Sequence, residues 1–230
     1  MATTRARILE ALEKVASALG PDVANVVFLG ATASALYPAN SLTDIRPTND
    51  VDLLVRTSLA EYYALMARLK ERGFEECRDE GAPTCRRRLG DDLQVDVMVP
   101  DPEVLGFSNK WYPEAFDRAA SYPLPSGRPI RAITPIYFLA TKLEAFRSRG
   151  KGDFRSKDIE DIVLMLDGNP DVLHLVQEDD GAAASEVKDQ LAQFARNRDF
   201  EDAVFGCFPG DNASQGRAAA GLARLLQAVS

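Results

Sequence analysis

Phe28-Leu29-Gly30-Ala31-Thr32-Ala33 is the stretch of this 230-residue chain that decides its fold, together with Asp50-Val51-Asp52-Leu53-Leu54-Val55 further on. The two stretches predict a strand, a glycine turn into a short helix, and a second strand that begins with two carboxylates. Because successive side chains of a strand alternate faces, Asp50 and Asp52 share one face while Val51 and Leu53 face the core. Two close carboxylates repel each other, and a divalent cation between them offsets the repulsion. The glycine turn can hold a phosphate on its backbone N–H groups, so the pair indicates a site for a metal ion and a nucleotide.

A third carboxylate, Asp96, extends this pattern. In the segment 93–99 every second residue is apolar, and Asp96 lies on the opposite face. If this segment and the segment 50–55 are neighbouring strands, three carboxylates converge at one edge of a sheet. Such a cluster suits two metal ions about 3.5–4 Å apart, which stabilise the attacking and leaving oxygens in phosphoryl transfer. The alternative interpretation is a set of solvated surface acids.

A second block of motifs consists of Lys142-Leu143-Glu144-Ala145-Phe146-Arg147 and Lys157-Asp158-Ile159-Glu160-Asp161-Ile162. Together with Gly30 to Ala33, the run from Arg46 to Leu53 and the later Asp96, this block resembles the nucleotidyltransferase superfamily related to DNA polymerase beta. More narrowly, the chain resembles the AbiEii/MenT-like nucleotidyltransferases, which are toxins of bacterial toxin–antitoxin and abortive-infection systems. The resemblance covers residues 25–165, and the last third of the chain matches none of the family's motifs.

The resemblance implies an enzyme that moves a nucleoside monophosphate from a nucleoside triphosphate (NTP) to an acceptor hydroxyl, for which a tRNA 3′ end is one candidate. It implies a toxin with an antitoxin protein as a partner, and it implies Mg²⁺, with Mn²⁺ as an alternative. The residues expected to bind the metal are Asp50, Asp52 and Asp96. The residues expected to bind the nucleotide are Gly30, Ala31, Thr32, Arg46 and Lys142. The residues expected to act in catalysis are Asp50, Asp52, Asp96, Lys142 and Asp158.

The second block suggests how these residues divide the work. Lys142 is expected to reach the β- and γ-phosphates, and Asp96 to accept the proton of the attacking hydroxyl. Asp158 and Asp161 are one helical turn apart and share a face, so either could orient Lys142 or position the acceptor. The alternative for Asp161 is a carboxylate stabilised by the helix dipole.

Three other interpretations stay open. The acceptor is an antibiotic, a metabolite or a protein; the chain binds a nucleotide without catalysis; or its acidic C-terminal helices bind a protein partner. A formal net charge of −8 argues against a surface that binds nucleic acid everywhere. A basic group in the segment 142–157 nevertheless suits a triphosphate and an RNA end, or else is a solvated helix face. It comprises Lys142, Arg147, Arg149, Lys151, Arg155 and Lys157.

Composition indicates a globular cytoplasmic protein. The chain contains 46% hydrophobic residues, yet no apolar stretch is long enough to span a bilayer and no signal-peptide core is present, so no membrane partner is expected. Its three cysteines form no Cys-x-x-Cys pair, which fits free thiols in a reducing cytoplasm. The single histidine, His174, argues against zinc hydrolases and against catalysis by a serine–histidine or cysteine–histidine pair.

The hydrophobic periodicity predicts an α+β fold, in which a small mixed β-sheet core with flanking helices precedes a C-terminal helical region. The expected domains are a nucleotidyltransferase core at residues 1–133 and a helical region at 134–230 that closes the active site. An amphipathic helix is expected at 5–19, a helix capped by Ser58 at 58–72, and a hairpin at Gly90-Asp91. The expected strands are 26–29, 50–56, 74–77, 84–89 and 93–99, with short edge strands at 122–124 and 129–132. The expected C-terminal helices are 135–149, 156–166, 170–177, 183–197 and 214–228.

Overall fold

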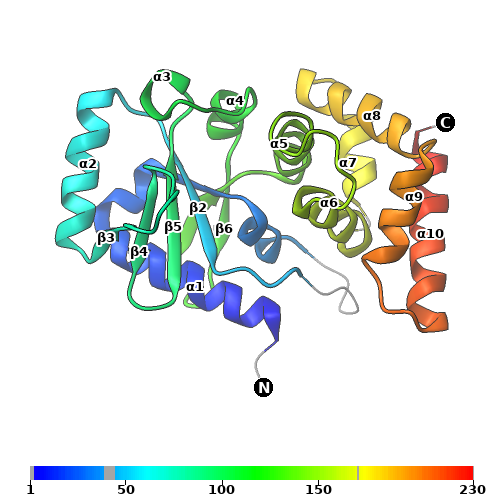
Figure 1. Cartoon of the computed structure of the whole chain (residues 1–230), viewed down its shortest axis with the longest axis horizontal. Coiled ribbons are helices and arrows are strands. Elements are labelled where there is room, and N and C mark those ends of the chain that lie inside the picture. The colour runs from blue at the N-terminus through cyan, green and yellow to red at the C-terminus, as the bar shows by residue number, and fades with distance from the viewer. Residues whose placement is uncertain (1–2, 39–44, 170, 230) are drawn as a thin grey trace. The chain divides into compact units, whose positions relative to one another are not determined.

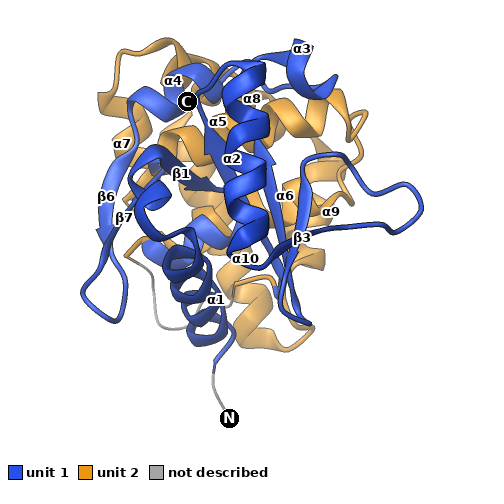
Figure 2. Ribbon diagram, turned by 90° about the vertical axis from the view of Figure 1, so that its left-hand side faces the viewer, with its two compact units in different colours: residues 1–36, 47–134 blue, residues 37–46, 135–230 orange. Residues whose placement is uncertain are grey.

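The computed structural model describes residues 3–38, 45–169 and 171–229. The chain divides into two compact units, which Figure 2 shows in different colours. Unit 1 comprises residues 1–36 and 47–134, and unit 2 comprises residues 37–46 and 135–230. The segment that contains Arg46 therefore belongs with the C-terminal helices, although it precedes most of the sheet in sequence. The predicted roles of residues 1–133 as a nucleotidyltransferase core and of residues 134–230 as a helical region that closes the active site stay predictions.

Unit 1 is built on a seven-stranded sheet with the strand order β3-β4-β5-β2-β1-β7-β6. The strands β2 and β5 pair in parallel, as do β1 and β7, and the other neighbours are antiparallel. The sheet is therefore mixed, which confirms the predicted α+β class. The strands are β1 (Val26–Leu29), β2 (Asp50–Val55), β3 (Phe74–Glu76), β4 (Arg86–Leu89), β5 (Leu93–Met98), β6 (Ala120–Pro123) and β7 (Pro129–Ala132).

One strand prediction needs correction, because β7 is not at the edge of the sheet. It lies between β1 and β6, so β6 and β3 form the two edges. Ile130 and Ala132 on β7 are buried, which is the burial expected of an interior strand. The predicted hairpin is confirmed, since β4 and β5 pair in an antiparallel register with Leu89 opposite Leu93.

Two long helices and several short ones complete unit 1. Helix α1 (Thr4–Leu19) buries a stripe of apolar residues at helical spacing, including Ile8, Leu12 and Leu19. Helix α2 (Leu59–Glu71) begins with a capping box between Ser58 and Glu61, which confirms the predicted cap. Figures 1 and 2 show α1 and α2 on the same side of the sheet. The short helices are η1 (Gly20–Asn25), η2 (Ala31–Leu36), α3 (Pro102–Leu105) and α4 (Tyr112–Asp117), of which η1, α3 and α4 were not predicted.

Unit 2 is helical and has an aromatic core. The rings of Phe146, Phe154, Phe194 and Phe200 contact one another with centroids 5.0–6.0 Å apart. Tyr37 packs edge-on against Phe138 at 6.1 Å, which ties the first part of the 37–46 segment to this unit. The helices are α5 (Pro135–Ser148), α6 (Lys157–Gly168), α7 (Val172–Glu178), α8 (Ala182–Phe194), α9 (Arg198–Gly206) and α10 (Asn212–Ala228). Helix α9 was not predicted, and residue 170 of the expected 170–177 helix lies outside the described residues.

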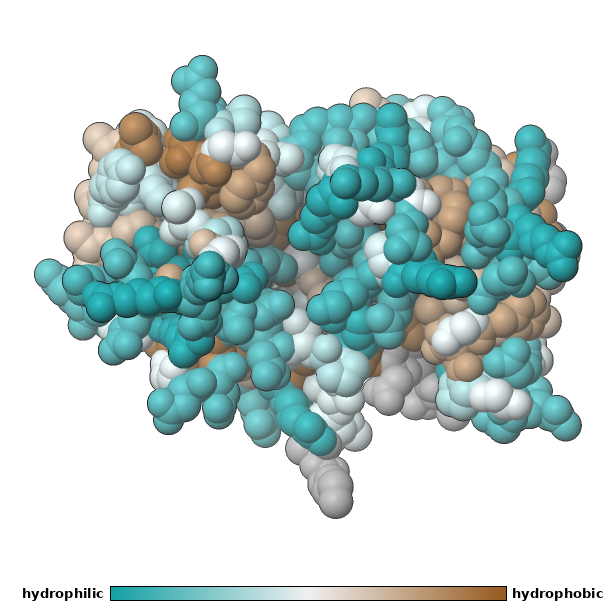
Figure 3. Space-filling model, in the orientation of Figure 1, coloured by the Kyte–Doolittle hydropathy of each residue, from teal (hydrophilic) through white to brown (hydrophobic). Residues whose placement is uncertain are grey.

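The surface in the view of Figure 3 is dominated by hydrophilic residues, as expected when the apolar side chains fill the cores of the units. Among the helices formed by the described residues, none has the length and apolar character that crossing a membrane requires.

Candidate active site

Three of the predicted carboxylates lie on one face of the unit 1 sheet. Asp52 on β2 is in register with Asp96 on the parallel strand β5, and Asp50 pairs with Gln94 two residues away. Paired residues of neighbouring strands point to the same face, so the three acids share it. All three are partly exposed, whereas Val51 and Val95 on the opposite face are fully buried. The parallel pairing of β2 and β5 therefore places the three carboxylates in one row. The sequence predicted this convergence only if the two strands were neighbours.

Gly30 brings the backbone of the turn after β1 against Asp52. Its φ is +72°, a left-handed conformation that glycine adopts without strain. A Cβ atom at this position would lie 1.8 Å from the Asp52 Oδ2 atom, so no other residue fits there without movement. The structure thus places the predicted glycine directly beside a predicted catalytic carboxylate.

The residues after Gly30 are buried in the short helix η2. The Thr32 hydroxyl is almost completely buried and donates a hydrogen bond to the Leu29 carbonyl at 3.4 Å. Ser34 donates to the Ala31 carbonyl at 2.7 Å. Both hydroxyls donate hydrogen bonds to carbonyl groups within the turn. A ligand that binds at Ala31 or Thr32 would therefore have to contact backbone groups. The loop before β2 is similarly organised, because the Asp50 backbone N–H donates to the Thr48 hydroxyl at 3.2 Å.

Arg86 on β4 adds a positive charge to this face. It pairs in register with Asp96, and its Nε and a terminal guanidinium nitrogen each donate to a separate Asp96 oxygen at 2.8 Å. The hydrogen bonds to Asp96, against the opposing effect of burial, raise the pKa of the Arg86 guanidinium, and the charges of Asp96 and Asp50 add to this. Asp52, Asp96 and Arg86 thus form one row across three neighbouring strands.

The carboxylates fit a divalent cation in chemistry and only partly in arrangement. Asp50 and Asp52 supply the hard oxygen donors that Mg²⁺ prefers. Both Asp96 oxygens are engaged by Arg86. Among the residues that the structure describes, no group of three or more His, Cys, Asp or Glu side chains is arranged to hold a metal ion. The three-carboxylate metal site therefore stays a prediction.

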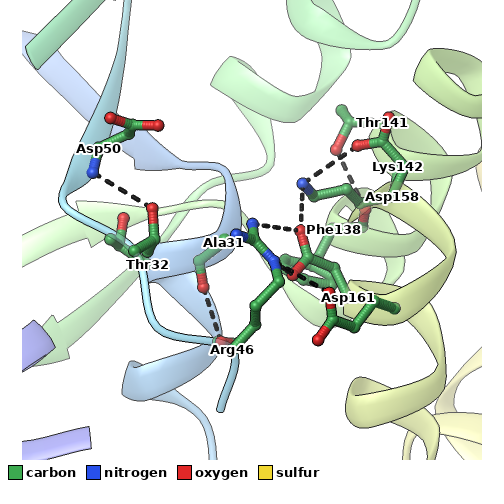
Figure 4. Close-up of polar contacts among 12 residues, drawn as sticks. Ala31, Thr32, Arg46, Asp50, Phe138, Thr141, Lys142, Asp158 and Asp161 are labelled. Atoms are coloured by element: carbon green, nitrogen blue, oxygen red, sulfur yellow. Dashed lines mark hydrogen bonds and ion pairs between the residues drawn. The ribbon is translucent and has the colours of Figure 1, made fainter. Parts of the chain in front are cut away.

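A second charged cluster, which we call the ion cluster, lies in unit 2 and contains Arg46, Lys142, Arg149, Asp158 and Asp161. Figure 4 shows Arg46, Lys142, Asp158 and Asp161 of this cluster. Lys142 Nζ on α5 lies 2.6 Å from Asp161 Oδ2 and 3.3 Å from Asp158 Oδ1, both on α6. Arg46 donates to both Asp161 oxygens, at 2.8 and 3.2 Å. The exposed Arg149 donates to both oxygens of Asp158, at 3.3 and 2.9 Å. The structure thus brings Arg46 together with Lys142 and Asp158, of which only the last two were predicted to interact.

The ion cluster is largely shielded from water. Lys142, Asp158 and Asp161 expose 8%, 4% and 5% of their surface. Burial raises the pKa of Asp158, but the hydrogen bond from Arg149 and the charge of Lys142 outweigh it and lower that pKa overall. Burial lowers the pKa of Arg46, but the hydrogen bond to Asp161 and its charge outweigh it and raise that pKa. Each charge therefore depends on its partners to remain buried.

Three residues of these clusters were absent from the predicted site. Asp161 carried a sequence signal, since it lies one turn after Asp158 on the same face of α6. Arg86 also carried one, because a hairpin that pairs Leu89 with Leu93 places Arg86 opposite Asp96. For Arg149, the only signal in the sequence was its position in the basic segment 142–157. The sequence offered no signal for the contact between Arg46 and Asp161, which are 115 residues apart.

Comparison with known proteins finds matches among solved structures. No family model and no curated protein matches the sequence. A crystal structure of an antigenic nucleotidyltransferase-like protein from Paracoccidioides brasiliensis aligns with 85% of this chain and 91% of its own, at 21% sequence identity and a TM-score of 0.49. A likeness this low does not bear on chemistry, so the function is argued from the residues themselves.

Proposed function

We propose that this chain is a metal-dependent nucleotidyltransferase that moves a nucleoside monophosphate from an NTP to an acceptor hydroxyl. The observation that carries the proposal is the register of β2 and β5, with Asp52 beside Asp96 and Asp50 on the same face. Three partly exposed carboxylates on one face form a negative site that attracts a cation. The close approach of Gly30 to Asp52 adds support, because it brings a turn backbone to the same place.

In the proposed reaction, the acceptor oxygen attacks the α-phosphorus and forms a new P–O bond. The bond from the α-phosphorus to the bridging oxygen breaks, and pyrophosphate leaves. Asp50, Asp52 and Asp96 would hold Mg²⁺ or Mn²⁺, which supplies positive charge to offset the triphosphate. Asp96 accepts the proton of the acceptor hydroxyl on a carboxylate oxygen. Arg46 and Lys142 are assigned to the phosphate oxygens, and Asp158 to the orientation of Lys142, which it contacts at 3.3 Å.

The direct test combines the purified chain, Mg²⁺, total RNA and each α-labelled NTP in turn. We expect label on RNA and release of pyrophosphate with at least one NTP. Asp52→Asn should lower this transfer by more than about 1,000-fold, a loss of about 4 kcal/mol of transition-state stabilisation. Asp91→Asn is the matched control, because Asp91 is an exposed aspartate in the hairpin turn. Unchanged turnover in Asp52→Asn would remove the assignment, and nucleotide binding without pyrophosphate release would favour a binding module.

For the acceptor, we propose an RNA end, and specifically a tRNA 3′ end as the family resemblance implies. Support comes from Lys151, Arg155 and Lys157, which are exposed basic residues within seven positions of unit 2. Replacing all three with alanine should weaken RNA labelling and flatten its dependence on salt, by about 0.7 in the log–log slope for each phosphate that the protein no longer neutralises. The control is Arg196→Ala/Arg198→Ala/Arg224→Ala, which removes the same charge from exposed positions elsewhere in unit 2. Equal labelling of an antibiotic, metabolite or protein added to the mixture would reassign the acceptor.

The toxin role and an antitoxin partner complete the proposal. Modification of tRNA ends would stop translation, so expression of the chain in growing bacteria should arrest growth. Expression of Asp52→Asn at the same level should not arrest it, because the arrest requires transfer. Growth arrest by both proteins would show that toxicity does not come from nucleotide transfer.

A further inference from the structure

Arg86 holds the third carboxylate of the proposed site in a geometry that leaves neither oxygen unengaged. The guanidinium is a planar fork, and the two 2.8 Å contacts use both Asp96 oxygens in the bidentate arrangement that gives the strongest Arg–carboxylate pairs. The side chains are partly shielded, with 26% of Arg86 and 13% of Asp96 exposed. Since an arginine does not lose its proton in a protein, this charge stays in place at any working pH.

Arg86 also supplies positive charge of the kind that a metal ion would bring to the three carboxylates. It lies on the same sheet face as Asp96 and Asp52, and the negative charge of Asp50 also raises the pKa of its guanidinium. Its positive charge therefore offsets the repulsion among the three acids, as a metal ion would. The two guanidinium contacts use one lone pair on each Asp96 oxygen, so a metal ion at Asp96 has either to displace a contact or to share an oxygen with Arg86 against the repulsion between the two cations.

Resting on the proposed function, we propose that Arg86 is a positioning residue that competes with a divalent cation for Asp96. In the protein without metal, the Arg86 guanidinium fixes the orientation of Asp96 and offsets the negative charge of the three carboxylates. On metal binding, the guanidinium gives up at least one carboxylate oxygen. Arg86 thereby sets the metal affinity of the site, and it prevents three unpaired carboxylates from standing together.

Arg88 provides a matched control on the same strand. It lies two residues from Arg86 and therefore on the same face, but its guanidinium pairs with the exposed Asp79, outside the carboxylate row. Arg88→Gln and Arg86→Gln remove the same charge from nearby positions. A general electrostatic effect would change metal affinity alike in both variants, whereas competition at Asp96 would appear only in Arg86→Gln.

The experiment titrates Mn²⁺ alone into the full chain at constant ionic strength and measures free Mn²⁺ by electron paramagnetic resonance. We expect Arg86→Gln to bind Mn²⁺ about tenfold more tightly than the wild type, because one charged hydrogen-bonded contact no longer competes. Arg88→Gln should stay within about twofold of the wild type, and Asp52→Asn should bind far more weakly. Arg86→Lys, which keeps the charge but loses the fork, should lie between wild type and Arg86→Gln and carries the test if Arg86→Gln does not fold.

The outcomes separate the inference from the function on which it rests. Equal Mn²⁺ affinity in wild type and the Arg86 variants, or weaker binding in the variants, would overturn the competition while leaving the metal site in place. An equal gain in Arg86→Gln and Arg88→Gln would overturn it too, because long-range charge would then explain the effect. Absence of Mn²⁺ binding in every protein, or binding that Asp52→Asn does not weaken, would contradict the proposed metal site and the inference with it.

Discussion

The carboxylate row of unit 1 and the ion cluster of unit 2 contain the same kinds of side chains but balance them differently. Asp50, Asp52 and Asp96 share a partly exposed sheet face with Arg86, which binds Asp96. In unit 2, Arg46, Lys142 and Arg149 are paired with Asp158 and Asp161, and most of the cluster is buried. The first cluster carries excess negative charge that an added cation can neutralise. In the second, each carboxylate already has two cationic partners within the cluster.

This difference separates two roles for charged residues. A like-charged, partly exposed group costs stability and is explained by what it binds. A paired, buried group is required by the fold, because the loss of one partner leaves the others buried without compensation. For Lys142 and Arg46 to bind phosphates, as proposed, the nucleotide has to compete with Asp158 and Asp161. The predictions below test this contrast, starting with the largest expected effect.

Asp161→Ala should destabilise the protein strongly. The substitution leaves Lys142 and Arg46 buried without their shared partner, so we expect the free energy of unfolding to fall by about 3–5 kcal/mol. Urea unfolding followed by circular dichroism measures the change. Asp171→Ala, at an exposed position in unit 2, should stay within about 0.5 kcal/mol of the wild type. In contrast, Asp52→Asn should lower stability far less, because it removes one charge from a row of like charges. A loss of several kcal/mol in Asp52→Asn, with little effect of Asp161→Ala, would reverse the comparison.

Gly30→Ala should affect both stability and activity, whereas Gly127→Ala should affect stability alone. Both glycines have left-handed φ values, +72° and +84°, so each substitution costs about 1–2 kcal/mol in backbone strain. Only at Gly30 does the new Cβ collide with Asp52, while no atom lies within 4 Å of a Cβ at Gly127. Unfolding and pyrophosphate-release assays on both variants measure the difference. If the two variants lost stability equally and both kept activity, Gly30 would have no part in the site.

Much of the secondary structure followed from the sequence, and the failures have physical causes. Strand β1 was predicted to the residue, because it is a short apolar run that ends at Gly30. The Ser58 cap and the hairpin turn were also predictable, since both depend on local chemistry. Helix α9 was missed because its nine residues are fewer than the about 11–18 over which hydrophobic periodicity can be recognised. The interior position of β7 depends on pairing with β1, about a hundred residues earlier, which no local pattern encodes.

The candidate site also combines features that the sequence predicted with features that it did not. The alternation of Asp50 and Asp52 and the single acid of β5 predicted three converging carboxylates once the two strands were assumed to be neighbours, and their parallel pairing is known only from the structure. The pairs that neutralise charges were harder to foresee. Arg46 meets Asp161 through tertiary packing across 115 residues, so only the folded structure reveals that a predicted nucleotide-binding residue already has a partner.

The acid stability of the protein should depend on Asp158. Its pKa is lowered in the folded state, so its stabilising contribution is present above its ordinary value and is lost as the pH falls through the lower, folded value. The wild type should therefore lose stability from about pH 4 downwards. Asp158→Asn, which has no carboxylate to protonate, should be less stable at pH 7 and show a shallower loss below pH 4. Urea unfolding from pH 2.5 to 7 gives both profiles, and parallel profiles would show that Asp158 does not contribute to the pH dependence.

The smallest expected effect concerns the thiols of Cys85, which is buried, and Cys207, which is partly buried. Each thiol lies near one of the two clusters. Burial raises the pKa of Cys85 to about 12, and the charge of Asp96 adds to this. Burial raises the pKa of Cys207 to about 11, and the charges of Glu160 and Asp161 add to this. At pH 8 a disulfide reagent should therefore react quickly with Cys77 alone, because only the thiolate is nucleophilic. Cys77→Ser should abolish the fast phase and Cys207→Ser should keep it. A fast thiol in Cys77→Ser would mean that one cluster opens to water.

The most direct test of the carboxylate row is to locate a metal ion in it. The full chain would be crystallised with Mn²⁺ and a non-hydrolysable NTP analogue, and anomalous scattering would give the metal position. We predict a peak within about 2 Å of oxygens from both Asp50 and Asp52, with the analogue's phosphates beside it. A structure in which the analogue binds elsewhere, or in which Mn²⁺ avoids these two side chains, would contradict the account.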